Sequence, residues 1–176
     1  MESLKFFGLV VVIVLTGLSA GLCFTWTNTV TKGIGVLDDF VYLQSFQQMN
    51  RAILNPMFLL VFFGPFFINV LNIFLYKGHS KTILGLLVLA LLLYFFGVVL
   101  VTIFGNVPLN EMLDKVNIAL TSTEDLSALR QRFEVRWNQL HLIRTITSLF
   151  SFLLLIICLY LSGKGSISNH IYQNNN

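Results

Sequence analysis

Long runs of apolar residues dominate the chain. Four of them are long enough to cross a bilayer as helices, which takes about 20 residues each, and they cover residues 6–26, 53–76, 82–104 and 140–161. The pattern predicts an all-α protein in which four transmembrane helices form a bundle. Because the runs are closely spaced, we expect one integral membrane domain over residues 1–176.

The first and third connecting loops carry weaker patterns of their own. Apolar residues recur at helical spacing between residues 31 and 52, which predicts a short interfacial helix. In the third loop, Ser122 and Asp125 resemble a capping box, and an apolar stripe follows: Leu126, Leu129, Phe133 and Trp137. This predicts an amphipathic helix over about 123–138 that either rests on the membrane surface or caps the open end of the bundle.

Local signals mark individual spans. Lys5 and small residues before Gly21 loosely resemble a signal sequence, but the apolar run continues beyond a typical signal core, so we expect a retained helix. Gly17 and Gly21 favour close helix packing. Pro65 should kink the second span, and the asparagines that follow it favour hydrogen bonds between helices. Gly105, Asn106 and Pro108 together predict a stop to the third helix.

Composition supports a membrane protein. The chain is 56% hydrophobic and 11% charged, with a mean hydropathy of +0.80, which is too apolar for a soluble domain of this length. The net charge of +3 is small and scattered, so we expect the lipid bilayer as a partner and no nucleic acid. Cys23 and Cys158 lie in apolar runs, without the spacing of a metal site or a disulfide framework.

The number of spans bears on orientation. An even number places both termini on one side of the membrane and the two patterned loops on the other. The terminal side carries four lysines, whereas the other seven basic residues lie among seven of the eight acidic ones. The positive-inside rule is weakest in such structured segments. We expect both termini to face the cytoplasm.

Polar residues gather where three of the spans meet the loop side. The set is Asn50, Arg51, Asn55, Asn106, Asn110, Trp137, Asn138, His141 and Arg144. Arg144 lies about one turn inside the fourth span, where an arginine is costly unless it faces a polar interior or snorkels to the interface. His141 shares its helix face with Arg144. Any one of these residues is typical of a helix cap or a headgroup anchor, but their convergence predicts a shared pocket.

The residue types in this set favour one kind of chemistry. An imidazole, fixed positive charges and amide donors suit removal of a proton from an acidic carbon and stabilisation of the enolate that forms. We expect no metal site, because His141 is the only suitable histidine and the nearby carboxylates lack ligand-like spacing to it. The sequence has no Gly-rich phosphate loop, serine elbow or paired cysteines.

Three strings of the chain together resemble the anthrone-oxygenase-like family, a domain-of-unknown-function group of small four-helix membrane proteins. They are "NRAILNPMFLLVF" at the second span, "GNVPLNEML" after the third and "RWNQLHLIRT" at the start of the fourth. The resemblance runs through nearly the whole chain, and "GNVPLN" is its most specific string. It implies the four-helix membrane fold. Characterised relatives are fungal enzymes that oxidise anthrones to anthraquinones with molecular oxygen, without an established metal or flavin.

The resemblance also implies a site. Its motif positions are Arg51, Asn55, Asn106, Asn110, Asn138 and Arg144. We predict that Arg144 is catalytic and that the asparagines and Arg51 bind substrate. From the chemistry of the residues we add His141 as the catalytic base, and we add Trp137 to the substrate-binding set.

Three functions are compatible with these features. The first is a membrane oxidoreductase, similar to a cofactor-independent monooxygenase, that uses molecular oxygen on a lipophilic aromatic or quinone-like substrate. The second is a noncatalytic membrane protein that binds a lipid or quinone, or a subunit of a membrane complex. A proton-coupled transporter is least favoured, because no Asp or Glu lies inside any of the four spans.

Overall fold

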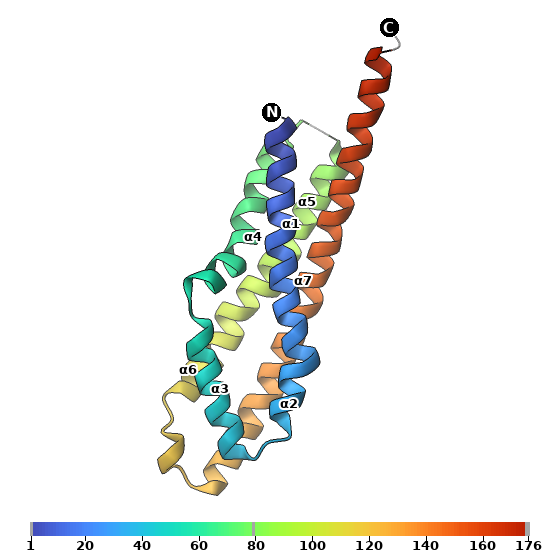
Figure 1. The fold of residues 1–176 in the computed structure, drawn as a ribbon. Helices are drawn as coiled ribbons and strands as arrows, with labels where there is room; N and C mark the ends of the chain where they lie inside the picture. The colour runs from blue at the N-terminus through green and yellow to red at the C-terminus, as the bar shows by residue number, and fades with distance from the viewer. Residues whose placement is uncertain (1, 79, 175–176) are drawn as a thin grey trace.

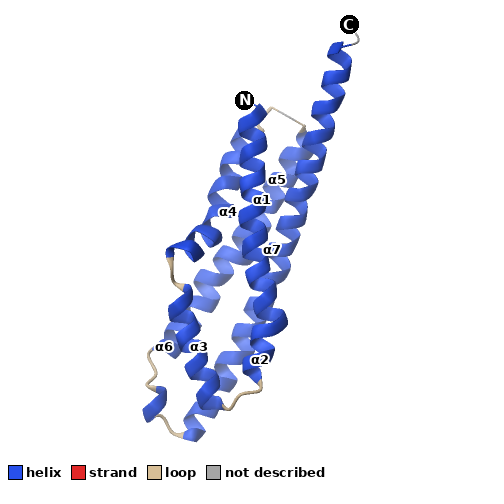
Figure 2. Cartoon of the chain, in the orientation of Figure 1, coloured by secondary structure: helices blue, strands red, loops and turns tan. Residues whose placement is uncertain are grey.

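The computed structural model describes residues 2–78 and 80–174, and the side chains of residues 3–78 and 80–164. All regular structure in this part of the chain is helical (Figure 2). Four helices are long and apolar enough to cross a membrane: Ser3–Gly35, Pro56–Leu75, Lys81–Asp114 and Thr123–Lys164. They pack side by side with both chain ends at one end of the bundle (Figure 1). The predicted all-α bundle of four membrane-spanning helices is confirmed. We call the end opposite the termini the loop-side end.

The first long helix is continuous through three segments. These are α1 (Glu2–Thr25), a π-helical segment (Trp26–Val30) and α2 (Thr31–Gly35). After a short turn, α3 (Asp39–Ile53) forms the helix predicted in the first loop. Asp38 caps it, because the Asp38 Oδ1 accepts a hydrogen bond from the Val41 N–H at 2.9 Å.

The second long helix, α4 (Pro56–Leu75), begins after a two-residue break at Leu54 and Asn55. Asn55 caps it by accepting from the Phe58 N–H at 3.0 Å. Pro65 lies inside α4 and supplies no N–H to the turn before it. Next to that gap, the Phe62 carbonyl accepts a hydrogen bond from the Tyr94 hydroxyl at 2.9 Å.

The predicted stop in the third long helix is wrong. The chain remains helical through α5 (Lys81–Tyr94), two π-helical segments (Phe95–Leu100 and Thr102–Asn106) and α6 (Val107–Asp114). Pro108 lies in the first turn of α6, where a missing N–H costs little. Gly105 remains helical because its missing side chain makes room for Leu140, which a Cβ at this position would meet at 2.9 Å.

The helix predicted in the third loop is not a separate element. It is the first part of α7 (Thr123–Asn174), which continues without interruption into the fourth span. Its start is capped as predicted, since the Asp125 N–H donates to the Ser122 Oγ at 3.2 Å. No glycine or proline interrupts the following residues up to Ser162, so nothing ends the helix between the two predicted pieces.

The apolar stripe of this part of α7 packs against α3 rather than facing lipid. Leu126, Leu129, Phe133 and Trp137 are buried in one cluster with Tyr42, Leu43 and Phe46 of α3. The predicted helix could either rest on the membrane surface or cap the bundle, and in the structure it caps the loop-side end. This cap holds α3 against α7 and closes the bundle on the side away from the termini (Figure 1).

Polar contacts join the spans, as expected for the second helix. The Asn72 side-chain amide donates to the Gly8 carbonyl at 3.0 Å, and that of Asn69 donates to the Leu87 carbonyl at 3.1 Å. Gly17 lies against Phe152, whereas Gly21 has no neighbour in the space where a Cβ would be. The two glycines therefore do not form a single packing surface, although Gly17 allows the close approach that was predicted.

Candidate functional site

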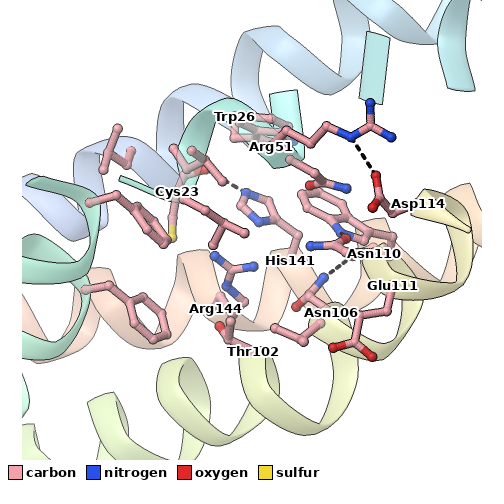
Figure 3. Close-up of a pocket in the computed structure, with 18 of the residues that line it drawn as sticks. Cys23, Trp26, Arg51, Thr102, Asn106, Asn110, Glu111, Asp114, His141 and Arg144 are labelled. Carbon is pink, nitrogen blue, oxygen red and sulfur yellow. Dashed lines mark hydrogen bonds and ion pairs between the residues drawn. The ribbon is translucent and has the colours of Figure 1, made fainter. Parts of the chain in front are cut away.

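A cavity of about 350 Å³ lies in the loop-side half of the bundle (Figure 3). Its lining comes from α3 and from all four long helices. A designed protein cavity of ~150 Å³ holds one benzene molecule, so this volume has room for an aromatic molecule of two or three rings. The walls are mainly apolar, with Leu22, Ile53, Phe58, Val61 and Phe62 among them. Such walls with a few polar groups are typical of small-molecule sites.

Six of the eight predicted site residues line this cavity: Arg51, Asn106, Asn110, Trp137, His141 and Arg144. The other two do not. The Asn55 side chain forms hydrogen bonds with local backbone groups. Its Oδ1 caps α4, and its Nδ2 donates to the Ala52 carbonyl at 3.1 Å. Asn138 follows Trp137 by one residue, and this step of about 100° turns it away from the face that lines the cavity.

His141 is held in one orientation. A carbonyl only accepts hydrogen bonds, so the 3.1 Å contact to the Cys23 carbonyl places a proton on His141 Nε2. Its ring also stacks on Trp137, with centroids 4.8 Å apart and planes 13° from parallel. The other ring nitrogen, Nδ1, is buried and has no hydrogen-bond partner within the part of the chain that the structure describes. In the neutral ring Nδ1 is therefore the nitrogen with an available lone pair.

Arg144 lies deeper in the bundle and is 9% exposed. Among the described residues, no carboxylate forms an ion pair with it, and its buried Nε has no hydrogen-bond partner. The Cys23 thiol lies beside the guanidinium (Figure 3). A buried positive charge without an acidic partner is costly. This cost is recovered if an anionic group of a ligand pairs with Arg144.

The two asparagines after the third span have different surroundings. Asn110 Oδ1 accepts from the Trp137 indole N–H at 2.8 Å, so Asn110 fixes the ring that stacks on His141. Asn106 is 1% exposed, and its Nδ2 donates to the Trp137 carbonyl at 3.3 Å. Its Oδ1 is buried without a partner. Asn106 therefore joins the third helix to α7 and keeps one acceptor unused.

An ion pair lies at the outer edge of the cavity. Arg51 Nε and Asp114 Oδ1 are 2.7 Å apart and join the end of α3 to the end of α6. Both side chains are about half exposed, at 53% and 51%, so this pair adds little to stability. Glu111 and Lys115 lie on the same edge, which makes this part of the rim charged.

The sequence interpretation missed the contribution of the first span. Ser19, Cys23 and Trp26 all line the cavity, and their spacing of four and three places them on one helix face. Cys23 was not among the predicted site residues. Trp26 lies in a π-helical segment, as do Thr102 and Asn106 across the cavity, and such segments are frequent at functional sites. The helical spacing of Ser19, Cys23 and Trp26 was the signal in the sequence that could have identified them.

The arrangement of polar groups suits a reaction that develops negative charge in a lipophilic molecule. Arg144 supplies a fixed positive charge in a site with apolar walls, where electrostatic stabilisation is strongest. His141 supplies a basic nitrogen, and Asn106 an amide acceptor. Within the described residues, no three His, Cys, Asp or Glu side chains are grouped to hold a metal ion.

Comparisons with known proteins identify one family. The family model described as anthrone oxygenase matches residues 53–154, which is more than half of the chain. The match contains Asn106, Asn110, Trp137, His141 and Arg144, whereas Arg51 and the first span lie outside it. No curated protein and no solved structure matches the chain.

Proposed function

The chain belongs to the anthrone oxygenase family, and on this premise we propose that it is a membrane oxidoreductase of the oxygenase type that acts on a lipophilic aromatic or quinone-like substrate. One observation carries the proposal. Arg144 is buried beside an apolar cavity and has no acidic partner among the described residues. A substrate that becomes an enolate would supply the missing negative charge.

The proposed reaction begins with proton removal. His141 takes a proton from an activated CH₂ group at Nδ1, since its Nε2–H is already held by the Cys23 carbonyl. Because Nδ1 is buried, the ring has to shift slightly when substrate binds. The enolate oxygen pairs with Arg144, and the carbanion carbon adds molecular oxygen. The peroxide anion that forms takes the proton from His141 and becomes a hydroperoxide. This hydroperoxide loses its remaining C–H proton and a hydroxide ion as water, so that CH₂ becomes C=O, with one oxygen atom in the ketone and one in water. No resident cofactor enters this scheme.

Oxygen uptake tests this function. The purified protein in nanodiscs is given an anthrone, and the rate is compared with nanodiscs that lack protein, because anthrones also oxidise spontaneously. We expect Arg144→Ala and Asn106→Ala to lower the protein-dependent rate, with a loss of about 10²- to 10³-fold for Arg144→Ala. Arg136→Ala is the matched control, since Arg136 is exposed on the same helix. Unchanged rates in both site variants would remove the proposed site.

The same samples distinguish the noncatalytic alternative. The chain has two tryptophans, Trp26 and Trp137, and both line the cavity. Their fluorescence reports on a bound quinone, which quenches indole emission. Saturable quenching without any oxygen uptake favours a protein that binds a quinone or lipid without catalysis, or a subunit that delivers it to a partner.

We also propose that both termini face the cytoplasm. The lysines near the terminal end of the bundle support this orientation, and it puts the cavity near the opposite surface of the membrane. Reporter domains fused to each terminus, one fluorescent only in the cytoplasm and one active only outside it, test the orientation. Activity of the second reporter at either terminus contradicts it.

A further inference from the structure

The wall of the cavity includes the break between two helices. Leu54 lies between α3 and α4 and is 71% exposed, yet it also lines the cavity. Val107 begins α6, is 37% exposed and lines the cavity too. α4 packs on α1, on α5 and on Phe95–Leu100, whereas within the described residues its packing on Thr102–Asn106 and α6 is weaker. Leu54 and Val107 are thus exposed apolar residues on the rim of the cavity, and we call the space between them the gap.

The surface outside this gap is apolar. Met57, Leu60 and Phe104 are 69%, 57% and 77% exposed. All three belong to helices that are long and apolar enough to cross a membrane, so this surface suits contact with lipid chains. Apolar residues thus run from the lipid-facing surface through the gap to Phe58 and Phe62 in the cavity.

The part of the rim nearer the loop-side end is charged. Arg51 and Asp114 join the ends of α3 and α6 there, beside Glu111 and Lys115. A ligand that enters past these residues would come directly from water, and it would have to pass between paired charges. By way of Leu54 and Val107, a ligand dissolved in the bilayer passes apolar side chains and, beside Leu54, the neutral amide of Asn55. The two parts of the rim therefore differ in which molecules they admit.

We propose that the ligand enters sideways from the hydrocarbon layer, through the gap between Leu54 and Val107, and that this route selects neutral molecules that become anionic only beside Arg144. The reason is the cost of charge in a hydrocarbon medium, which keeps permanent anions out of the bilayer core. Arg144, which has no acidic partner among the described residues, then stabilises the anion formed inside. The ligand class is a bilayer-soluble aromatic or quinone-like weak acid, and only its acidity rests on the proposed function.

A matched pair of quenchers tests the route without requiring any turnover. Anthraquinone dissolves in the bilayer, whereas anthraquinone-2-sulfonate has the same rings and a permanent charge. Each is mixed with the full-length protein in phosphatidylcholine nanodiscs, and the quenching of Trp26 and Trp137 is followed by stopped flow. We expect saturable, rapid quenching by anthraquinone, and quenching by the sulfonate that is at least about ten times slower at equal concentration.

Rim variants identify the opening. Leu54→Arg and Val107→Arg should each slow the onset of anthraquinone quenching about tenfold, because each places a charge in the apolar gap. Met57→Arg is the control, since Met57 is as exposed as Leu54 but does not line the cavity. Asp114→Asn, which breaks the outer ion pair, should leave the rate unchanged. Leu54→Gln serves in place of the arginine variant if the latter does not fold.

Two results would overturn the proposal. One is equal quenching by the two probes. The other is a rate that rises in Asp114→Asn and stays the same in both Leu54 and Val107 variants, because the ligand would then enter through the charged rim. Failure of the proposed function is a separate result. It appears as absent oxygen uptake while anthraquinone still quenches through the gap.

Discussion

Two arginines on α7, Arg130 and Arg144, have opposite surroundings. Arg130 is surrounded by partners: it donates to two carboxylates, Glu134 at 2.7 Å and Asp39 at 3.1 Å, and to the carbonyls of Leu37 and Gly35, both at 2.7 Å. Its guanidinium also lies 4.2 Å above the Tyr42 ring. Arg144 has no such oxygen partner among the described residues.

The difference separates a structural arginine from a candidate functional one. Arg130 joins α7 to the turn between α2 and α3, and all of its partners are supplied by the fold. At Arg144 the fold supplies the positive charge and leaves the negative one to be added. A residue whose hydrogen bonds are complete stabilises the protein, whereas a buried residue with incomplete ones is a candidate for binding a ligand.

Replacing Arg144 should have the largest effect on activity and almost none on stability. Arg144→Met removes the charge that pairs with the proposed enolate, so we expect a loss of about 10²- to 10³-fold in the protein-dependent oxygen uptake. The unfolding midpoint should stay the same or rise, because an apolar side chain replaces a buried charge without a partner. Unfolding in detergent and oxygen uptake are measured on the same preparation. A large drop in the midpoint would mean that Arg144 is structural.

Replacing Arg130 should instead lower stability and leave ligand binding in the cavity unchanged. Arg130→Met leaves two carboxylates and two carbonyls without their donor, which should lower the free energy of unfolding by about 3 kcal/mol. Quenching of the tryptophans by anthraquinone should persist at temperatures where the variant is folded, since Arg130 does not line the cavity. Arg132→Met is the control, because Arg132 is exposed and, among the residues that the structure describes, donates only to the Ala128 carbonyl of its own helix. Equal stability of the two variants contradicts the comparison.

Asn72 extends the comparison to a neutral side chain. Asn72→Leu loses the hydrogen bond to the Gly8 carbonyl in the other half of the bundle from the cavity. Interhelical hydrogen bonds in membranes contribute about 0.6 kcal/mol on average and up to ~1.7 kcal/mol, so we expect a destabilisation in this range. Anthraquinone quenching should be unaffected. A change in quenching amplitude would indicate that Asn72 influences the cavity from a distance.

Replacing Arg51 should lower stability less than replacing Arg130 or Asn72. Its pair with Asp114 is half exposed on both sides, and exposed ion pairs contribute about 0–1 kcal/mol. Arg51→Gln should therefore shift the free energy of unfolding by less than about 0.5 kcal/mol, and the shift should vanish at high salt. A salt-independent loss as large as that of Arg130→Met would show that exposure does not explain the difference between the two ion pairs.

The site was predictable where it depended on helix ends and obscure where it depended on packing. Asn106, His141 and Arg144 stood out because polar residues beside apolar runs are costly unless they face one another. Asn55 is likewise a polar residue beside an apolar run, but its side chain caps the first turn of α4. Cys23 gave only the signal of its helical spacing with Ser19 and Trp26, since its thiol resembles any small core residue and only the packing of α1 on α7 brings it beside Arg144.

The fold shows the same division. The number of spans followed from the lengths of the apolar runs, but the continuity of the third helix did not. Gly105 and Pro108 are common at helix ends, and they are accepted within a helix here because Leu140 packs against one and the other begins a new turn. Likewise, only the burial of the apolar stripe of the third loop against α3 decided that this segment caps the bundle rather than resting on the membrane surface.

The sequence by itself determined that four segments are long and apolar enough to cross a membrane and that one arginine lies inside the last of them. These are local properties, because the length of an apolar run and the depth of a charge within it are set by neighbouring residues. Only the tertiary structure decided which arginine has partners. Among the partners of Arg130, Glu134 is local, four residues along the same helix, whereas the Gly35 carbonyl lies 95 residues earlier in the chain. Partners this distant are brought together by packing of the helices, which leaves Arg144 with its charge directed to the cavity.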